Sequence, residues 1–216
     1  MSTTTIATPP ATTRTRSTTR ALLVALAVSG PLWGAVSLAQ VAAHDGFDPT
    51  RFPLSMLAAG PSGWIQIANF VVAGLLMVAG AAGLRRAVPS RWAPRLTAVY
   101  GAGYVLAGVF VMDPGGGWPV GTPAEAPAQL SWHAAAHLLA GTVAFVALAA
   151  AHLVLARYFA RRGERAWAWT ARAGAAGVIA GDVASMAQLG AHLMAAGVLA
   201  SMLLLSLIAA KLRRER

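Results

Sequence analysis

The chain has 216 residues, of which 57% are hydrophobic and only 11% are charged, and its mean hydropathy is +0.60. This composition excludes an ordinary soluble domain and indicates a membrane protein. The net charge of +10 does not indicate nucleic-acid binding, because the basic residues form short clusters between long apolar segments. The chain has no Cys, which excludes disulfides, thiolate metal sites and thiol chemistry. Only one of the 17 Lys and Arg residues is Lys, which with the high Ala content indicates a GC-rich bacterial genome.

The N-terminal region is polar and then apolar. Residues 1–20 are rich in Thr, lack acidic residues and have no apolar period, so we expect a disordered cytoplasmic tail. The segment 21–43 follows basic residues and contains Ser37-Leu38-Ala39, a combination that also occurs in cleaved signal peptides. Its apolar run exceeds the usual signal core of about 7–15 residues, so we expect a retained helix. Gly30 and Pro31 at its middle predict a kink.

Six apolar segments are long enough to cross the bilayer core, which takes about 20 helical residues. They are 21–43, 64–84, 96–112, 132–156, 166–184 and 189–210. The sequence therefore predicts an all-α integral membrane bundle of six transmembrane helices over residues 21–210, followed by a basic cytoplasmic tail at 211–216.

The basic residues predict the orientation of this bundle. All Lys and Arg residues except Arg51 fall in the N-terminal tail, the second loop, the region around the fourth loop, or the C-terminal tail. Because basic residues near span ends stay on the cytoplasmic side, both termini are expected in the cytoplasm, with the protein in the cell inner (plasma) membrane. Six of the seven Trp residues lie near predicted span ends, where aromatic rings prefer the interface, and Trp33 is the exception.

The fifth segment has small residues four apart, at Ala173, Gly177 and Gly181. Such a face lets another helix approach closely. The pattern makes it a candidate surface for a homo-oligomer, although a chain rich in Gly and Ala also produces it by chance.

Polar side chains at membrane depth usually face the interior of a bundle, and here nearly all of them gather on the predicted outer side. His133 and His137 are four apart, and Gln66 and Asn69 three apart, so each pair shares a helix face. We expect an outward-facing polar pocket. Its candidate ligand-binding residues are His44, Asp48, Ser55, Gln66, Asn69, Asp113, His133 and His137.

Several short motifs of the chain occur together in one known family. They are His44-Asp45-Gly46-Phe47-Asp48-Pro49, Phe52-Pro53-Leu54-Ser55-Met56-Leu57, Gly63-Trp64, Asn69-Phe70, Gly74-Leu75-Leu76, Gly108-Val109-Phe110-Val111-Met112-Asp113-Pro114, and His137. Over roughly 21–210 the chain resembles the six-helix bacterial and archaeal membrane proteins grouped as domain of unknown function 998. The resemblance implies an outer-face cluster at Asp48, Ser55, Asp113 and His137. It implies no reaction, substrate or cofactor.

Three interpretations of the outer cluster stay open. It can bind or sense a small or lipidic ligand, which suits a polar pocket between apolar helices. It can be purely structural and hold the loops 44–63 and 113–131 on the helix ends, because Ser55 and Asp48 are also capping and turn residues. It can belong to a zinc-type intramembrane hydrolase, with His133, His137 and Asp113 as metal ligands.

Haem binding is not expected. His137 and His152 lie on one segment near opposite faces of the membrane, but each haem needs a second imidazole, and only His192 is available on the outer side. His152 is interpreted as a helix-end residue near the inner phosphates.

We expect a non-enzymatic binder without a cofactor, whose partners are the lipid bilayer and a small-molecule or lipid ligand, and not nucleic acid. A functional pocket predicts that Asp113→Asn leaves the melting temperature unchanged or raises it, because the change relieves repulsion with Asp48.

Overall fold

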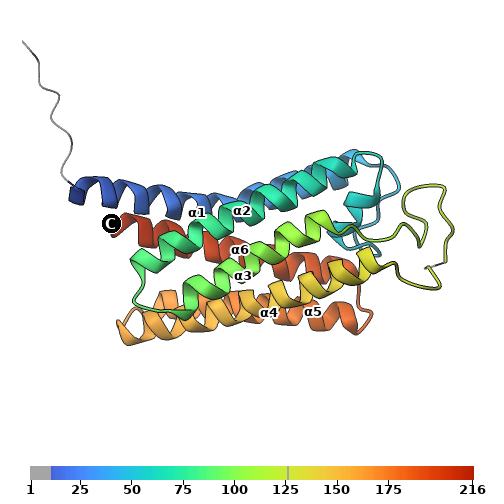
Figure 1. The fold of residues 1–216 in the computed structure, drawn as a ribbon. Helices are drawn as coiled ribbons and strands as arrows, with labels where there is room; N and C mark the ends of the chain where they lie inside the picture. Colours follow the sequence, from blue (N-terminus) through green and yellow to red (C-terminus); the bar gives the residue numbers. More distant parts are fainter. Residues whose placement is uncertain (1–10, 126) are drawn as a thin grey trace, which may run out of the picture.

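The computed structural model describes residues 11–125 and 127–216, which form α-helices and one short 3-10 helix, so the all-α class is confirmed (Figure 1). In chain order the elements are α1 (Ala11–Ala43), η1 (Leu54–Ala59), α2 (Gly63–Ala87), α3 (Trp92–Val109), α4 (Trp132–Arg161), α5 (Arg165–Met186) and α6 (Ala191–Arg214). Each predicted apolar segment overlaps one α-helix.

Helix α1 begins earlier than the sequence predicts. Residues 11–20 were expected in a disordered tail, but α1 starts at Ala11, and the remainder of that predicted tail lies outside the described residues. Thr19 is buried beside the ends of α2 and α6, and its hydroxyl donates to the Thr15 carbonyl oxygen at 3.0 Å. Tertiary packing therefore extends the helix beyond its apolar part. The helix is also continuous through Pro31.

The six α-helices form a closed ring. Each packs against the next one along the chain, and α6 packs against α1. Glycines allow the closest approaches: a Cβ atom on Gly101 of α3 would lie 2.7 Å from the Gly74 carbonyl oxygen of α2. A Cβ on Gly181 of α5 would lie 2.7 Å from the Leu193 carbonyl oxygen of α6.

The small residues of α5 thus serve contacts within the chain. Gly181 packs on α6, and Gly177 lies against Gly197 of the same helix, whereas Ala173 is exposed. Two of the three residues proposed for a homo-oligomer are therefore covered by α6, because their missing side chains admit its backbone. The homo-oligomer itself stays a prediction.

The ring has two different ends (Figure 1). The first, here called the basic end, carries the start of α1, the α2–α3 and α4–α5 connections and the C-terminus. The second, the loop end, carries the connections 44–62, 110–131 and 187–190. Of all Lys and Arg residues, only Arg51 belongs to the loop end.

Four of the described helices, α1 from Thr15 onward, α2, α4 and α6, are long and apolar enough to cross a membrane. Large apolar side chains are exposed along the sides of the ring, among them Leu75, Leu139, Val146 and Leu207. Large apolar side chains exposed on several helices in this way indicate a membrane protein. Helix α3 has only 18 residues, and α5 carries two arginines and Asp182.

The tryptophans are divided between surface and interior. Trp64 and Trp132 are exposed at the loop end, and Trp92 and Trp169 are exposed at the basic end, where interfacial rings are expected. Trp118 was predicted among the interfacial rings, but it is only 2% exposed and fills the interior of the loop end. Its ring is covered because the loops on either side fold over it.

Candidate functional site

A cavity of about 170 Å³ lies inside the ring towards the loop end, and we call it the central cavity. All six α-helices and η1 contribute side chains to its wall. Most of these are apolar or aromatic. Its polar side chains are those of Ser55, His137, Thr142 and Asp182, together with the Trp33 and Tyr104 rings. One lining residue is acidic and, among the described residues, none is Lys or Arg.

Three aromatic rings form one side of the central cavity. The ring centroids of Phe70 and Tyr104 are 5.3 Å apart, and the Trp33 ring lies 6.0 Å from the first and 5.7 Å from the second. The tilted and edge-on arrangements are those that aromatic pairs prefer. Trp33 is buried, and its Nε1 has no hydrogen-bond partner among the described residues. An unpaired buried N–H is costly unless a ligand or water accepts from it.

His137 of α4 is the predicted histidine that reaches the central cavity. Its Nδ1 lies 3.0 Å from the Ala107 carbonyl oxygen and 2.7 Å from that of Phe110, and its ring stands edge-on to Phe70. Because carbonyl oxygens only accept, Nδ1 must carry the proton. In this tautomer Nε2 is the acceptor. Ser55 of η1, another candidate residue, also lines the cavity.

Gln66 and Asn69 belong to a different place from the predicted pocket. Both are buried against α1, in what we call the amide cluster. Gln40 Nε2 donates to Gln66 Oε1 at 2.7 Å, Gln66 Nε2 donates to Ser37 Oγ at 3.1 Å, and Asn69 Nδ2 donates to the Trp33 carbonyl oxygen at 3.1 Å. These side chains tie α2 to α1 and do not line the cavity. Their shared face points to a neighbouring helix, where both ends of the Gln66 amide find partners, while the Gln40 and Asn69 side-chain oxygens have none among the described residues.

His44 and Asp48 stabilise the connection after α1. The His44 Nδ1 is 2.8 Å from the Gln40 carbonyl oxygen at the end of that helix. Asp48 Oδ1 accepts from the amide and the hydroxyl of Thr50, at 2.8 and 2.7 Å, which is an Asx-type turn. Neither residue lines the central cavity.

Asp113 and His133 also lie outside the cavity. Asp113 accepts from the Ser131 amide at 2.7 Å and from its hydroxyl at 2.5 Å, and Ser131 caps α4 through the Ala134 amide. This pairing fastens the end of α3 to the start of α4. His133 is exposed beside the Trp132 ring, although it is four residues from His137. The geometry of Asp48 and Asp113 therefore favours the structural interpretation for these two carboxylates.

This pairing predicts that Asp113→Asn lowers the melting temperature near neutral pH. Hydrogen bonds from the Ser131 hydroxyl and amide hold the pKa of Asp113 below its ordinary value. A carboxylate with a depressed folded-state pKa stabilises the fold above its unfolded pKa of about 3.9, and this contribution disappears as the pH falls through the folded value. Melting curves between about pH 7 and pH 3 should show the difference from the unmodified protein shrinking in acid.

Asp45→Asn serves as the control for this comparison, since Asp45 is exposed and has no hydrogen bond to the described residues. A melting temperature for Asp113→Asn that is unchanged or raised at neutral pH would instead support repulsion between Asp48 and Asp113.

The candidate zinc ligands do not form a metal site among the described residues. In the part of the chain that the structure describes, no three His, Cys, Asp or Glu side chains are grouped so that they could hold a metal ion. His133, His137 and Asp113 do not form such a group, because Asp113 pairs with Ser131 and the two rings occupy different environments.

His152 differs from its interpretation as a helix-end residue. It is fully buried, its Nε2 is 3.1 Å from the Ser201 carbonyl oxygen of α6, and a Cβ on Gly174 would lie 2.6 Å from its Nδ1. Helix α4 continues to Arg161, five residues beyond the predicted span, which places His152 deeper in the bundle.

Sequence reasoning missed several cavity residues. Phe70 and Tyr104 were indistinguishable from ordinary apolar span residues. Two others had a signal in the sequence: Trp33 is the one Trp that lies away from a predicted span end, and Asp182 is an acidic residue inside a predicted span.

A protein-family model described as "Protein of unknown function (DUF998)" matches residues 27–212. No curated protein and no solved structure matches the chain.

Proposed function

Since the chain belongs to this DUF998 family, which is described only as of unknown function, we propose from its central cavity that it binds a small molecule or lipid head group carrying an ammonium group. The observation that carries the proposal is the composition of the wall: aromatic rings, one carboxylate and no Lys or Arg side chain among the described residues. Such a wall favours a cation over an anion. The proposed function is therefore to bind or sense such a ligand in the membrane.

The size and chemistry of the cavity support this ligand class. A cavity of about 150 Å³ can hold a molecule as large as benzene, so about 170 Å³ suits a compact group of a similar number of atoms. Electron-rich faces of Trp, Tyr and Phe attract quaternary ammonium groups, and the attraction increases when water is excluded. Asp182 supplies the opposite charge, and Nε2 of His137 and the hydroxyl of Ser55 are available as acceptors.

A lateral route leads to the central cavity. A groove of about 360 Å³ lies between α4 and α5 and shares Phe145 and Asp182 with the cavity. Its other lining residues are apolar, including Val146, Leu153 and Ile179. This arrangement supports entry of the ligand from the lipid phase between these two helices.

The cavity supports binding better than hydrolysis. A Ser–His–Asp arrangement needs the histidine Nδ1–H to face a carboxylate and Nε2 to face the serine. Here Nδ1 faces the carbonyl oxygens of Ala107 and Phe110, and no hydrogen bond joins Ser55 to His137 in the described part of the chain.

We also propose that all six α-helices cross the plasma membrane and that both termini are cytoplasmic. Helices α3 and α5 are antiparallel to their neighbours in the ring and expose apolar side chains such as Val99, Leu106 and Ile179. The concentration of basic residues at one end supports the orientation. Cytoplasmic reporters fused at residue 90, residue 163 or the C-terminus should be active, and reporters at 58 and 121 should behave as external. A cytoplasmic reading at 121 would contradict six spans.

The ligand proposal predicts that Gly141→Leu abolishes ligand binding without unfolding the protein. Gly141 lines the central cavity, and a Cβ there would meet no atom within 4 Å, so a larger side chain can grow into the cavity. Leu is also the better helix former, by roughly 0.5–1 kcal/mol. Choline and its neutral isostere 3,3-dimethyl-1-butanol are the probes. Choline alone should raise the melting temperature of the solubilised protein, and this rise should vanish in Gly141→Leu and in Asp182→Asn.

Ala135→Leu, on an exposed face of the same helix, is the matched control and should keep the response to choline. An equal response to both probes would contradict recognition of the charge, and an unchanged response in Gly141→Leu would contradict binding in the central cavity.

A further inference from the structure

A second hollow lies far from the central cavity, at the basic end of the ring between α2 and α3. This α2–α3 groove has a volume of about 410 Å³. Its apolar wall consists of Val78, Ala81, Ala82, Pro94 and Ala98, and its charged side chains are Arg85, Arg91 and Arg95. Apolar and cationic surfaces are therefore adjacent in one groove.

The three groove arginines have no acidic partner. The sequence contains no Asp or Glu between Asp48 and Asp113, and among the described residues none of the three arginines forms an ion pair. All three are exposed at the surface. Three like charges converge on one groove without an internal counter-charge, which is favourable only if an external anion or solvent compensates them.

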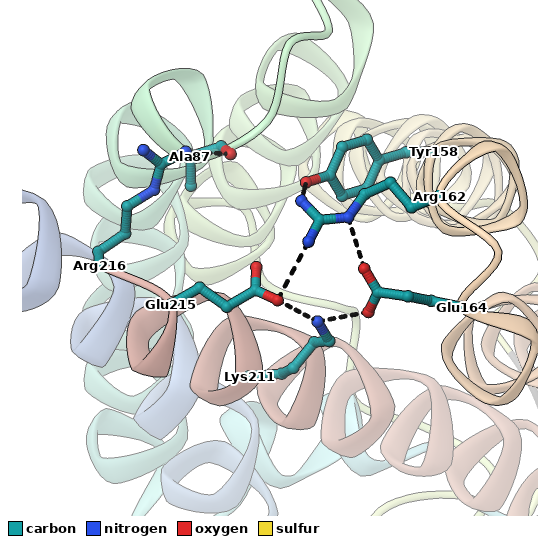
Figure 2. Close-up of polar contacts among 7 residues, drawn as sticks. All are labelled: Ala87, Tyr158, Arg162, Glu164, Lys211, Glu215 and Arg216. Carbon is teal, nitrogen blue, oxygen red and sulfur yellow. Dashed lines mark hydrogen bonds and ion pairs between the residues drawn. The ribbon is translucent and has the colours of Figure 1, made fainter.

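Two other basic side chains at the same end, Arg162 and Lys211, are compensated by acids, as Figure 2 shows. Arg162 pairs with Glu164 at 2.5 Å and with Glu215 at 3.3 Å, and Lys211 pairs with Glu164 at 2.5 Å and with Glu215. Both available acids of this end are thus used by the connection between α4 and α5 and by the end of α6. The groove arginines therefore have no acid of this end left to pair with, and they differ from the other unpaired arginines in lining a groove with an apolar wall.

We propose that the α2–α3 groove binds one anionic phospholipid, with its phosphate at Arg85, Arg91 and Arg95 and an acyl chain along the apolar wall. Arginine suits phosphate because its guanidinium donates two hydrogen bonds in parallel. Basic pockets between membrane helices recognise anionic head groups in this way. The site is separate from the central cavity and does not depend on the proposed ligand there.

A lipid is favoured over a free phosphate by what surrounds the arginines. Trp92 is 51% exposed, and the guanidinium groups of Arg91 and Arg95 lie 5.5 and 5.9 Å from its ring centroid. An exposed Trp beside arginines is typical of the lipid head-group region. The groove then continues along Val78 and Ala98, whose apolar surface can contact an acyl chain. A soluble anion gains no contact from this part of the groove.

The experiment measures lipid retention by the full-length protein in detergent. Native mass spectrometry is carried out after incubation with equimolar phosphatidylglycerol and phosphatidylcholine. The unmodified protein should retain one phosphatidylglycerol in preference to phosphatidylcholine. Each arginine near an anionic surface contributes roughly a five-fold preference, so the triple variant Arg85→Gln, Arg91→Gln, Arg95→Gln should lose on the order of 100-fold.

The matched control removes three exposed arginines of the same end, Arg161→Gln, Arg165→Gln and Arg213→Gln, with the same change in net charge, and should keep the preference. In a second experiment, phosphatidylglycerol with brominated acyl chains should quench the part of the tryptophan fluorescence that Trp92 contributes. This quenching should be missing in the Trp92→Phe variant. An equal loss of preference in both triple variants would overturn the site, as would quenching that does not depend on Trp92. Protection from brominated lipid by soluble glycerol phosphate would show that the groove holds a free phosphate instead.

Discussion

Replacing Trp118 with Ala should lower the free energy of unfolding by about 3–5 kcal/mol, the usual cost of emptying a buried Trp site. The Trp118 ring is enclosed at the loop end, with its centroid 5.0 Å from that of Phe47 and 6.4 Å from that of Phe52. Its Nε1 donates to the Met56 carbonyl oxygen at 2.8 Å. The side chain therefore joins the connection after α3 to η1, and its loss separates the two loops.

Thermal and denaturant unfolding in detergent, followed by circular dichroism, would measure this effect. Trp118→Phe loses the hydrogen bond and part of the ring volume but keeps much of the packing, so its cost should be smaller, at about 1–3 kcal/mol. Trp64→Ala is the control, because that ring is 71% exposed. If Trp118→Ala and Trp64→Ala melt alike, the loop end does not depend on the buried ring.

Gln66→Leu should lower the free energy of unfolding by roughly 2–4 kcal/mol, the second largest effect we expect. The substitution removes one amide but leaves Ser37, Gln40 and Asn69 buried without it. Each stranded polar group costs about 1–3 kcal/mol in water-soluble proteins, and less inside a membrane, where single hydrogen bonds average about 0.6 kcal/mol.

Unfolding measurements on Gln66→Leu can be compared with Gln129→Leu, which makes the same chemical change at an exposed position. Substituting the whole amide cluster with apolar residues should restore part of the lost stability, since no donor or acceptor is then left unpaired. A cost for Gln66→Leu no greater than that of the control would contradict the structural role of the cluster.

The helices could be predicted from the sequence because the length of an apolar segment alone determines whether it can span a bilayer. The direction in which a polar helix face points could not be predicted in this way. A spacing of three places Gln66 and Asn69 on one side of α2, but it does not say whether α1 or the ring interior receives that side. Only the contacts with Ser37 and Gln40 decide this.

The candidate site was predictable only in part, for the same reason. Ser55 and His137 were identified and do line the central cavity. Asp48 and Asp113 have sequence surroundings that serve a turn or a cap as well as a binding site, and their nearest hydrogen-bond partners, Thr50 and Ser131, decide between these roles. The aromatic wall joins residues from three helices, and no local spacing encodes such a meeting.

Closure of the ring by α6 has a consequence for biosynthesis. The Ser206 hydroxyl of α6 donates to the Leu26 carbonyl oxygen of α1 at 3.3 Å, across 180 positions of the chain. Met194, Ala195 and Val198 of the same helix complete the wall of the central cavity. While the ribosome is still making α6, the ring lacks the helix that packs against both α1 and α5, so it is open along that side. The cavity therefore forms only when translation has delivered the last helix.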